Sequence, residues 1–350
     1  MDKSIKYIPF GSLPYEDVNI VAKMIAKLHN DIPYVPILPK INANDNILSR
    51  TLSKIPGVCI KGEKIKLSVA TKLYNDELSK LEKAFNHPNI EHLEHFSIEA
   101  PFMEKFFQLI KKFKSQYALI NLLGPFTITQ MLTEVAEEQM LIDKTYRKLF
   151  IQSICVKALW AIKKIKEISP NTIPIIMLEE PLFYNLGVFK KNNEEITTEL
   201  IVKMFARVFG KLKGEGALVG MQCFKKCDWQ VPILAGIDII SFDAYNNPNN
   251  LNIIPEQVTD FLLNGGKINW GIIPPFNEEF IKNLSLEILT KRLFLTMDGL
   301  ISSGVPLDLL YKNSTISIQT NMENLPVIFA EKAVFLSNQL ANKLTIKDWH

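Results

Sequence analysis

The sequence predicts one α/β domain over residues 1–350, a (β/α)8 TIM barrel with an insertion between its second and third strands. Short apolar runs alternate along the chain with longer segments of helical periodicity, which indicates parallel strands joined by helical crossovers. Several of the runs are apolar at consecutive positions, as is typical of strands that are covered on both faces. A chain of 350 residues is long enough to form one such barrel.

Eight apolar runs are expected to form the strands of the barrel. They are residues 5–10, 33–38, 118–123, 174–178, 217–221, 237–242, 267–273 and 315–318. Helical patterns lie between them, beginning with 18–28. The long pattern at 141–168 is expected to end before Pro170, and Pro255 suits the first position of another helix.

Residues 41–117, between the second and third runs, are too many for a single crossover helix. Within them, residues 57–70 predict a β-hairpin that turns at positions 61–63. Two helical stretches follow, near 76–85 and 101–114. We interpret 41–117 as an insertion, a hairpin plus helices, that lies over the mouth of the barrel and acts as a lid.

The composition argues against several classes of function. A hydrophobic content of 47% with 22% charged residues is typical of globular proteins. The formal charge is only +3 and the lysines are scattered, which argues against binding to nucleic acid. No run of about 18 apolar residues predicts a membrane span, and the first residues lack the apolar core of a signal peptide. We therefore expect a cytoplasmic protein without membrane contact; the sequence does not determine its oligomeric state.

Polar or turn-forming residues directly follow the predicted strands. In a parallel barrel all strands end on the same face, and that face carries the active site. We therefore expect these residues to surround one mouth and to bind a small molecule there. The candidates are Ser12, Lys40, Thr127, Glu179, Glu180, Cys223, Asp243, Tyr245 and Thr320. The structural alternative is that glycine and proline only end the strands and that the polar residues only begin loops.

Two adjacent carboxylates, Glu179 and Glu180, follow the fourth predicted strand. Both cannot point into an apolar core, so one is expected to face the mouth. There it would bind an ammonium group or act as a general acid or base. We take Glu180, with Asp243 and Cys223, as the catalytic candidates and Glu179 as a binding residue. The alternative is that the pair caps the next helix or forms an ion pair with a lysine.

Seven short motifs occur in an order that is known from another family. They are GSLPYED, IPYVPILPK, LLGPFTITQ, LEEPLF, GALVGMQCFKKCDW, GIDIISFDAYN and NWGIIPP, within about residues 11–325. They resemble the catalytic barrel of cobalamin-independent methionine synthase. They resemble more closely the short single-barrel proteins related to it and to uroporphyrinogen decarboxylase. The resemblance implies that Ser12 binds the carboxylate of an amino acid, that Glu179 or Glu180 binds its amino group, and that a methylated folate is the co-substrate.

In methionine synthase, a zinc ion held by His, Cys, Glu and a second Cys activates the homocysteine thiol, and this set is incomplete here. Aligned on the Asp-Trp pair at 228–229, the His and first Cys positions hold Gln222 and Phe224. A shift by one residue retains Cys223 but places Met221 at the histidine position.

The two remaining ligand positions are also altered. The glutamate position falls on Asp243, and Thr320 lies in the segment where the last cysteine is expected. Gln, Phe and Thr are poor zinc ligands. We therefore expect the family's zinc site to be degenerate and assign no metal ligand.

Other interpretations of the cysteines stay open. Cys223 and Cys227 could hold a metal together with Asp243. Alternatively, Lys225 and Lys226 lower the pKa of a thiol, which would make Cys223 a reactive, catalytic residue. The third interpretation is that the thiols are reduced, buried and inert, because four cysteines in so long a chain do not form a disulfide framework.

Three functions are compatible with these features, and the sequence does not decide whether the protein is an enzyme. The first is a methyltransferase related to methionine synthase that acts on a small thiol or amino acid. Its usual mechanism is disfavoured, because a free alkyl thiol with a pKa of about 8.5 is mostly protonated at neutral pH. The second is a non-catalytic barrel that binds a ligand or a partner. The third is a metal-free decarboxylase that uses Lys40, Lys225 and Lys226, although the arginine-rich segment of that family is missing.

Overall fold

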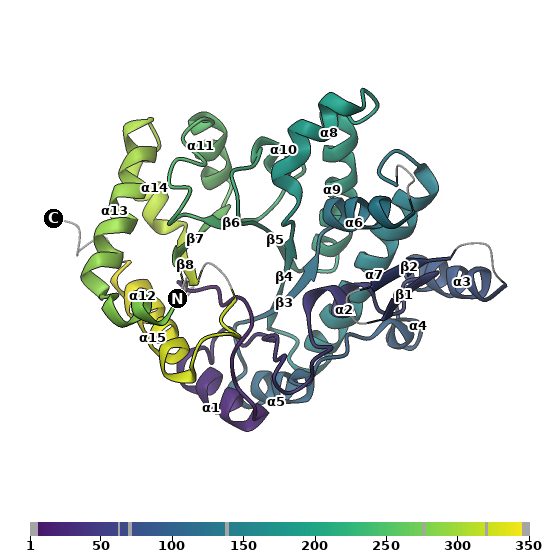
Figure 1. The fold of residues 1–350 in the computed structure, drawn as a ribbon, viewed down its shortest axis with the longest axis horizontal. Coiled ribbons are helices and arrows are strands. Elements are labelled where there is room, and N and C mark those ends of the chain that lie inside the picture. Colours follow the sequence, from purple (N-terminus) through teal and green to yellow (C-terminus); the bar gives the residue numbers. More distant parts are fainter. Residues whose placement is uncertain are drawn as a thin grey trace.

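A six-stranded parallel sheet forms the centre of the fold. The computed structural model describes residues 6–61, 64–68, 72–136, 140–274, 277–318 and 321–344. Neighbouring strands follow one another in sequence and pair in parallel: β3 (Tyr117–Leu123), β4 (Ile173–Glu179), β5 (Leu218–Cys223), β6 (Ile239–Asp243), β7 (Lys267–Ile273) and β8 (Ser314–Ile318). The sheet curls into a half-barrel, with helices around its outer side (Figure 1).

Helices connect the strands and cover the convex face of the sheet. They are α6 (Pro125–Ala136) and α7 (Lys144–Ile168) after β3; η2 (Phe183–Asn185), α8 (Leu186–Asn192) and α9 (Thr198–Lys213) after β4; α10 (Gln230–Leu234) after β5; α11 (Pro255–Leu263) after β6; α12 (Glu278–Asn283), α13 (Leu286–Ser302) and α14 (Leu307–Lys312) after β7; and α15 (Val327–Lys343) after β8. Trp229, before α10, packs on Phe242, and Phe242 packs on Trp270, with ring centroids 6.3 and 5.5 Å apart. These aromatic residues therefore mark the helix-covered face.

Within the described ranges, no helix has both the length and the apolar character needed to cross a bilayer.

The predicted closed barrel of eight strands is wrong. In the described residues, the segments expected as the first two strands, 5–10 and 33–38, form no strand. Each contacts an edge of the sheet through one isolated parallel bridge, Tyr7 to Ile316 and Tyr34 to Leu119. A third bridge joins Ser12, which lies two residues after the first segment, to Ile37 of the second. The physical reason is their proline content, because Pro9, Pro33 and Pro36 have no N–H to donate to a ladder. The fold is a six-stranded half-barrel with two extended segments at its open side.

The chain before β3 forms helices and a hairpin at one flank. The elements are α1 (Val18–Leu28), α2 (Ile47–Leu52), the antiparallel strands β1 (Val58–Lys61) and β2 (Lys64–Leu67), α3 (Lys72–Asn86), α4 (Ile90–Leu93), η1 (Glu94–Phe96) and α5 (Met103–Phe113). The expected hairpin is therefore present, although positions 62–63 of its turn lie outside the described residues. Helices α3, α4 and α5 contact α7, and β2 contacts α6 (Figure 1). These contacts place the insertion beside the half-barrel, whereas the sequence led us to expect it over the mouth.

Candidate functional site

A row of buried polar side chains crosses the concave face of the sheet at one level. The strand register aligns Glu179 with Gln222, and then Ser241, Asn269 and Thr315 on the next three strands. Asn269 donates to Ser241 Oγ at 2.9 Å and accepts from Thr315 Oγ1 at 2.8 Å. Side chains alternate between the two faces of a strand, and the neighbouring aromatic residues pack against the helices. The polar row therefore faces the inside of the half-barrel.

Glu179 lies at the carboxyl end of β4, at the first position of this row. Its Oε1 accepts a hydrogen bond of 3.0 Å from Nδ2 of Asn121 on β3, and both side chains are buried. Burial raises the pKa of Glu179 to about 7, against the opposing effects of the Asn121 hydrogen bond and of the positive charge of Arg50. A carboxyl group with this pKa can bind an ammonium group or exchange a proton near neutral pH.

Glu180 caps helix α6. Its Oε1 accepts the backbone N–H of Phe126 at 3.0 Å, and its Oε2 accepts that of Thr127 at 2.7 Å. Burial raises the pKa of Glu180 to about 7, although these hydrogen bonds lower it. A Cβ atom at Gly124 would lie only 2.1 Å from Oε1, so the position before the helix requires glycine. The sequence led us to expect, as the alternative, that both carboxylates cap the next helix; instead Glu180 alone caps α6, which precedes β4 in the chain. A carboxylate held in this way is a poor candidate for the catalytic role.

Thr127 and Ser12 join loops to one another. Oγ1 of Thr127 accepts the N–H of Leu182 at 3.3 Å, which ties the loop after β4 to the start of α6. The Ser12 hydroxyl donates to Glu323, and its N–H donates to Oδ1 of Asn321 at 3.0 Å. The first extended segment is thereby tied to the chain after β8.

Asp243, the last residue of β6, is held by the loop that follows it. Its Oδ1 accepts the N–H of Asn246 at 2.8 Å, and its Oδ2 accepts the side-chain amides of Asn246 and Asn247 at 2.8 and 3.3 Å. Burial raises the pKa of Asp243. Because both oxygens already accept hydrogen bonds from the chain, the first function of this carboxylate is to fix the loop.

The residues at this end of the sheet do not fit a zinc ion. Gln222 belongs to the polar row, and Phe224 packs on Phe10 with ring centroids 5.6 Å apart. In the part of the chain that the structure describes, no three His, Cys, Asp or Glu side chains are grouped so that they could hold a metal. The grouping of Cys223, Cys227 and Asp243 that the sequence left open is therefore not formed.

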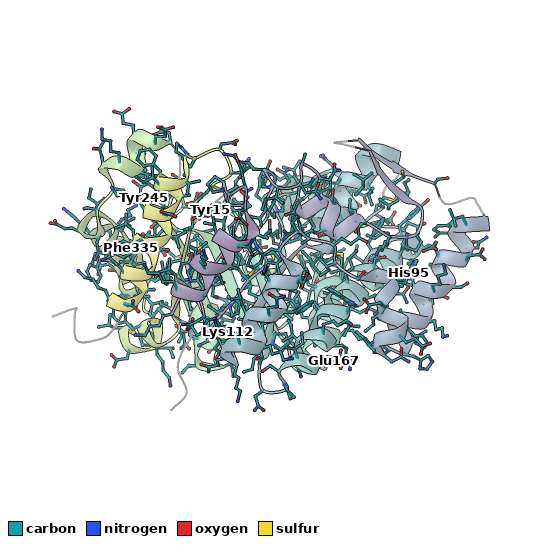
Figure 2. The ribbon with its side chains drawn as sticks, turned by 90° about the horizontal axis from the view of Figure 1, so that it is seen from below. Tyr15, His95, Lys112, Glu167, Tyr245 and Phe335 are labelled. Atoms are coloured by element: carbon teal, nitrogen blue, oxygen red, sulfur yellow. The ribbon has the colours of Figure 1, made fainter. Side chains whose placement is uncertain are left out.

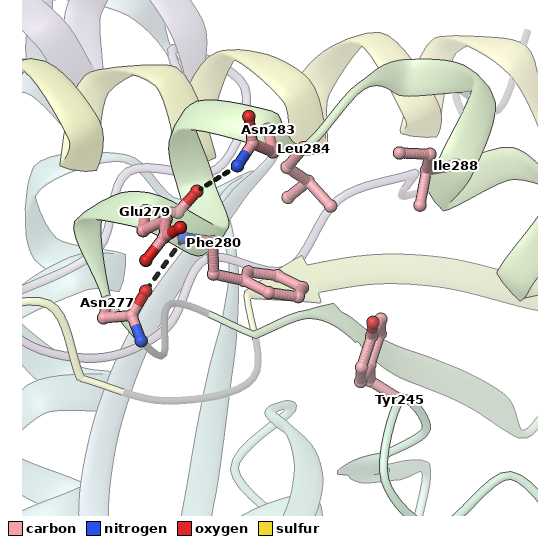
Figure 3. A pocket seen from close by; sticks show the side chains of 7 residues that line it. All are labelled: Tyr245, Asn277, Glu279, Phe280, Asn283, Leu284 and Ile288. Carbon is pink, nitrogen blue, oxygen red and sulfur yellow. Dashed lines mark hydrogen bonds between the residues drawn. The ribbon is translucent and has the colours of Figure 1, made fainter.

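Of the remaining candidates, Lys40 and Tyr245 do not belong to the polar row. Lys40 is exposed, and Thr320 lies outside the described residues. In Figure 2, Tyr245, which follows β6, lies towards the upper left of the molecule, whereas Glu167, which precedes β4, lies at its lower edge. Its ring borders a pocket of about 390 Å³ whose other lining residues are Asn277, Glu279, Phe280, Asn283, Leu284 and Ile288 (Figure 3). Tyr245 contacts Phe280 edge to face, with centroids 5.9 Å apart, so this pocket has an aromatic wall.

Two features of the site were missed at the level of the sequence. Asn121 is a single polar residue in the apolar strand YALINLL, and such a residue is a usable signal, because a buried polar group requires a partner. The second feature is a buried ion pair in which Arg50 Nε lies 2.8 Å from Asp45 Oδ1. Arg50 also donates to the carbonyl of Val35 at 2.7 Å, so it holds the second extended segment in place. No local pattern predicts this contact.

Comparison with known proteins assigns no family. No family model matches the chain, and no curated protein matches it. Among solved structures, a chitobiase from Flavobacterium johnsoniae matches with a TM-score of 0.38 and 11% identity. The match covers 99% of this chain and 52% of that chain, so this chain spans about half the length of that structure. At this score the likeness assigns neither fold nor activity.

Proposed function

We propose that the protein binds a small molecule of the amino-acid type at the carboxyl end of its half-barrel, and that Glu179 binds the ammonium group. The observation that supports this most is the position of the Glu179 carboxyl group. It is buried on the concave face, in register with Gln222, and within the described residues it accepts a hydrogen bond from Asn121 alone. Glu180, by contrast, has both oxygens on the N-terminus of α6.

An ammonium group beside Glu179 would stabilise its ionised carboxylate. A buried carboxylate without a cation is costly, which is why its pKa is raised. A ligand cation in contact with it stabilises the ionised form and lowers that pKa. Gln222 and Ser241 lie next along the row and offer amide and hydroxyl groups for the polar part of the same ligand.

The resemblance to methionine synthase adds a class of reaction to this proposal. It assigns the amino group of the substrate to Glu179 or Glu180, and the capping role of Glu180 favours Glu179. Methyl transfer from a methylated folate to the thiol of homocysteine is the reaction that the resemblance implies. The donor set does not fit zinc, so we derive no step through a metal.

Non-catalytic binding of the same ligand is the second candidate. It is favoured by Asp243, at the position of the family's glutamate ligand, whose oxygens accept hydrogen bonds from Asn246 and Asn247. A group held in this way serves the structure of the loop without taking part in a reaction.

Calorimetric titration with homocysteine and with 4-mercaptobutanoate, which lacks only the amino group, tests the proposal. We expect homocysteine to bind more tightly, and Glu179→Gln to weaken its binding at least tenfold. Glu180→Gln is the control and should retain the affinity. Equal affinity for the two compounds, or an unchanged affinity in Glu179→Gln, would refute the role of Glu179. Incubation with homocysteine and methyltetrahydrofolate then separates the candidates, since only a methyltransferase produces methionine.

A further inference from the structure

Cys223 and Cys227 form a pair of neighbouring thiols that the proposed function does not use. Cys223 is the last residue of β5, and Cys227 lies four positions later in the turn before α10. Both are free and buried, and each thiol lies close enough to the other to affect its pKa. The other two cysteines differ, because Cys59 is exposed and Cys155 is buried on helix α7 without a thiol neighbour of this kind.

The turn between the two cysteines is fixed by hydrogen bonds. The Cys223 thiol donates to the carbonyl of Lys225 at 3.5 Å. The N–H of Cys227 donates to Oδ1 of Asn250, at 3.3 Å, and Nδ2 of Asn250 donates to the same Lys225 carbonyl at 3.5 Å. One asparagine from the loop after β6 thus binds the end of the turn at Cys227 and the same Lys225 carbonyl that the Cys223 thiol contacts, so it links the two cysteines through hydrogen bonds.

The two thiols are electrostatically unequal. The neighbouring Cys227 thiol lowers the pKa of Cys223, whereas burial raises the pKa of Cys227 well above its ordinary value. The charge of Glu180 opposes ionisation of both thiols. Lys225, in the turn between the two cysteines, places its ammonium group 4.0 Å from the centroid of the Tyr184 ring of η2. Cys223 is therefore the sulfur that ionises first, and a thiolate of this kind is the nucleophile in thiol chemistry.

We propose that Cys223 and Cys227 are a redox-active dithiol that a small hydroperoxide converts into an intramolecular disulfide. The Cys223 thiolate attacks one peroxide oxygen and the O–O bond breaks, which gives a sulfenic acid. The leaving hydroxide takes up the proton that Cys223 released and becomes water. The Cys227 sulfur then attacks the Cys223 sulfur, an S–S bond forms, and the hydroxyl leaves with the Cys227 proton as a second water. The dithiol loses two electrons, and hydrogen peroxide gains them.

Oxidation of the full chain with stoichiometric hydrogen peroxide, followed by alkylation and peptide mass spectrometry, tests this proposal. The peptide that contains both cysteines is expected to lose two hydrogen masses and to escape alkylation, while Cys155 remains alkylatable. In Cys227→Ser the reaction should stop at a sulfenic acid on Cys223 that dimedone traps, and in Cys223→Ser the Cys227 thiol should stay reduced. If both thiols are still alkylated at a peroxide dose that modifies Cys59, or if Cys227→Ser gives no dimedone adduct on Cys223, the proposal is overturned.

A second measurement does not depend on oxidation or on the folding of a variant. Phenylarsine oxide binds two thiols only where they lie side by side, so the native wild-type chain should take up one equivalent. The adduct should map to the peptide with Cys223 and Cys227. Absence of this adduct from the native protein would contradict the proximity on which the disulfide depends.

Discussion

Glu179 and Glu180 are adjacent in the chain, yet their carboxylates bind different elements of the fold. Glu179 accepts a hydrogen bond from Asn121 on β3, inside the half-barrel, whereas Glu180 accepts two backbone N–H groups at the start of α6. Because successive residues at the end of a strand point in opposite directions, the pair divides into one structural carboxylate, Glu180, and one that belongs to the polar row, Glu179.

Removal of the Glu180 carboxylate should destabilise the fold. In Glu180→Ala the N–H groups of Phe126 and Thr127 lose their acceptor, and we expect the free energy of unfolding to fall by roughly 1–3 kcal/mol. Urea denaturation followed by circular dichroism measures this change. An exposed residue of the same type, as in Glu195→Ala, provides the control and should change stability little. Equal stability of the two variants would contradict the capping role.

The glycine before helix α6 should be just as intolerant of change. A Cβ atom at Gly124 would overlap the Glu180 carboxylate, so Gly124→Ala is expected to cost roughly 1–3 kcal/mol of stability. Gly187→Ala is the matched control, because a Cβ there meets no atom within 4 Å. That position is helical, and alanine should stabilise it by about 0.5–1 kcal/mol. Thermal unfolding of both variants checks the prediction. Equal changes in melting temperature for Gly124→Ala and Gly187→Ala would contradict it.

Lys157 should make the stability depend on pH. This lysine of α7 is buried and donates to the Ser53 hydroxyl at 3.2 Å, and burial lowers its pKa from 10.5 to about 7. Between these two values the unfolded chain binds more protons than the folded one, so the contribution of Lys157 to stability rises with pH. Below pH 7 the folded chain holds a buried charge. Lys157→Met should therefore be the more stable protein there, by up to roughly 4 kcal/mol.

The difference between wild type and Lys157→Met isolates this group from Glu179 and Glu180, whose raised pKa values act in the opposite direction. We expect the advantage of the variant to shrink as the pH rises from 7 towards 10.5. Chemical denaturation of both proteins at several pH values measures it. A difference that stays constant over this window would show that Lys157 has an ordinary pKa.

The strands of the half-barrel could be predicted from the sequence because their signal is local. The apolar run at 267–273 matches β7 at both ends, and the run at 118–123 matches β3 to within one residue. The first two runs are apolar as well, but Pro9, Pro33 and Pro36 remove the donors that a ladder needs. In these segments the loss of backbone donors at proline outweighs the hydrophobic pattern, which by itself predicts a closed barrel.

The candidate site could be predicted only in part. The position of polar residues at strand ends is a local property, and it identified Glu179, Glu180 and Asp243. Some of these carboxylates already accept hydrogen bonds from other parts of the chain, as Glu180 does from the start of α6. Such contacts depend on the tertiary fold. The Arg50–Asp45 ion pair likewise depends on where α2 lies relative to the second extended segment. Neither relationship is encoded in the spacing of residues.

The most direct test of the account is the number of protons released when homocysteine binds at pH 7, measured calorimetrically in buffers of different ionisation enthalpy. With a pKa of about 7, Glu179 is roughly half protonated in the free protein, and an ammonium group bound beside it should expel that proton. We therefore expect release of about half a proton per ligand in the wild type and none in Glu179→Gln. Binding without proton release in the wild type, or the same release in both proteins, would contradict the assignment of Glu179 as the ammonium-binding residue.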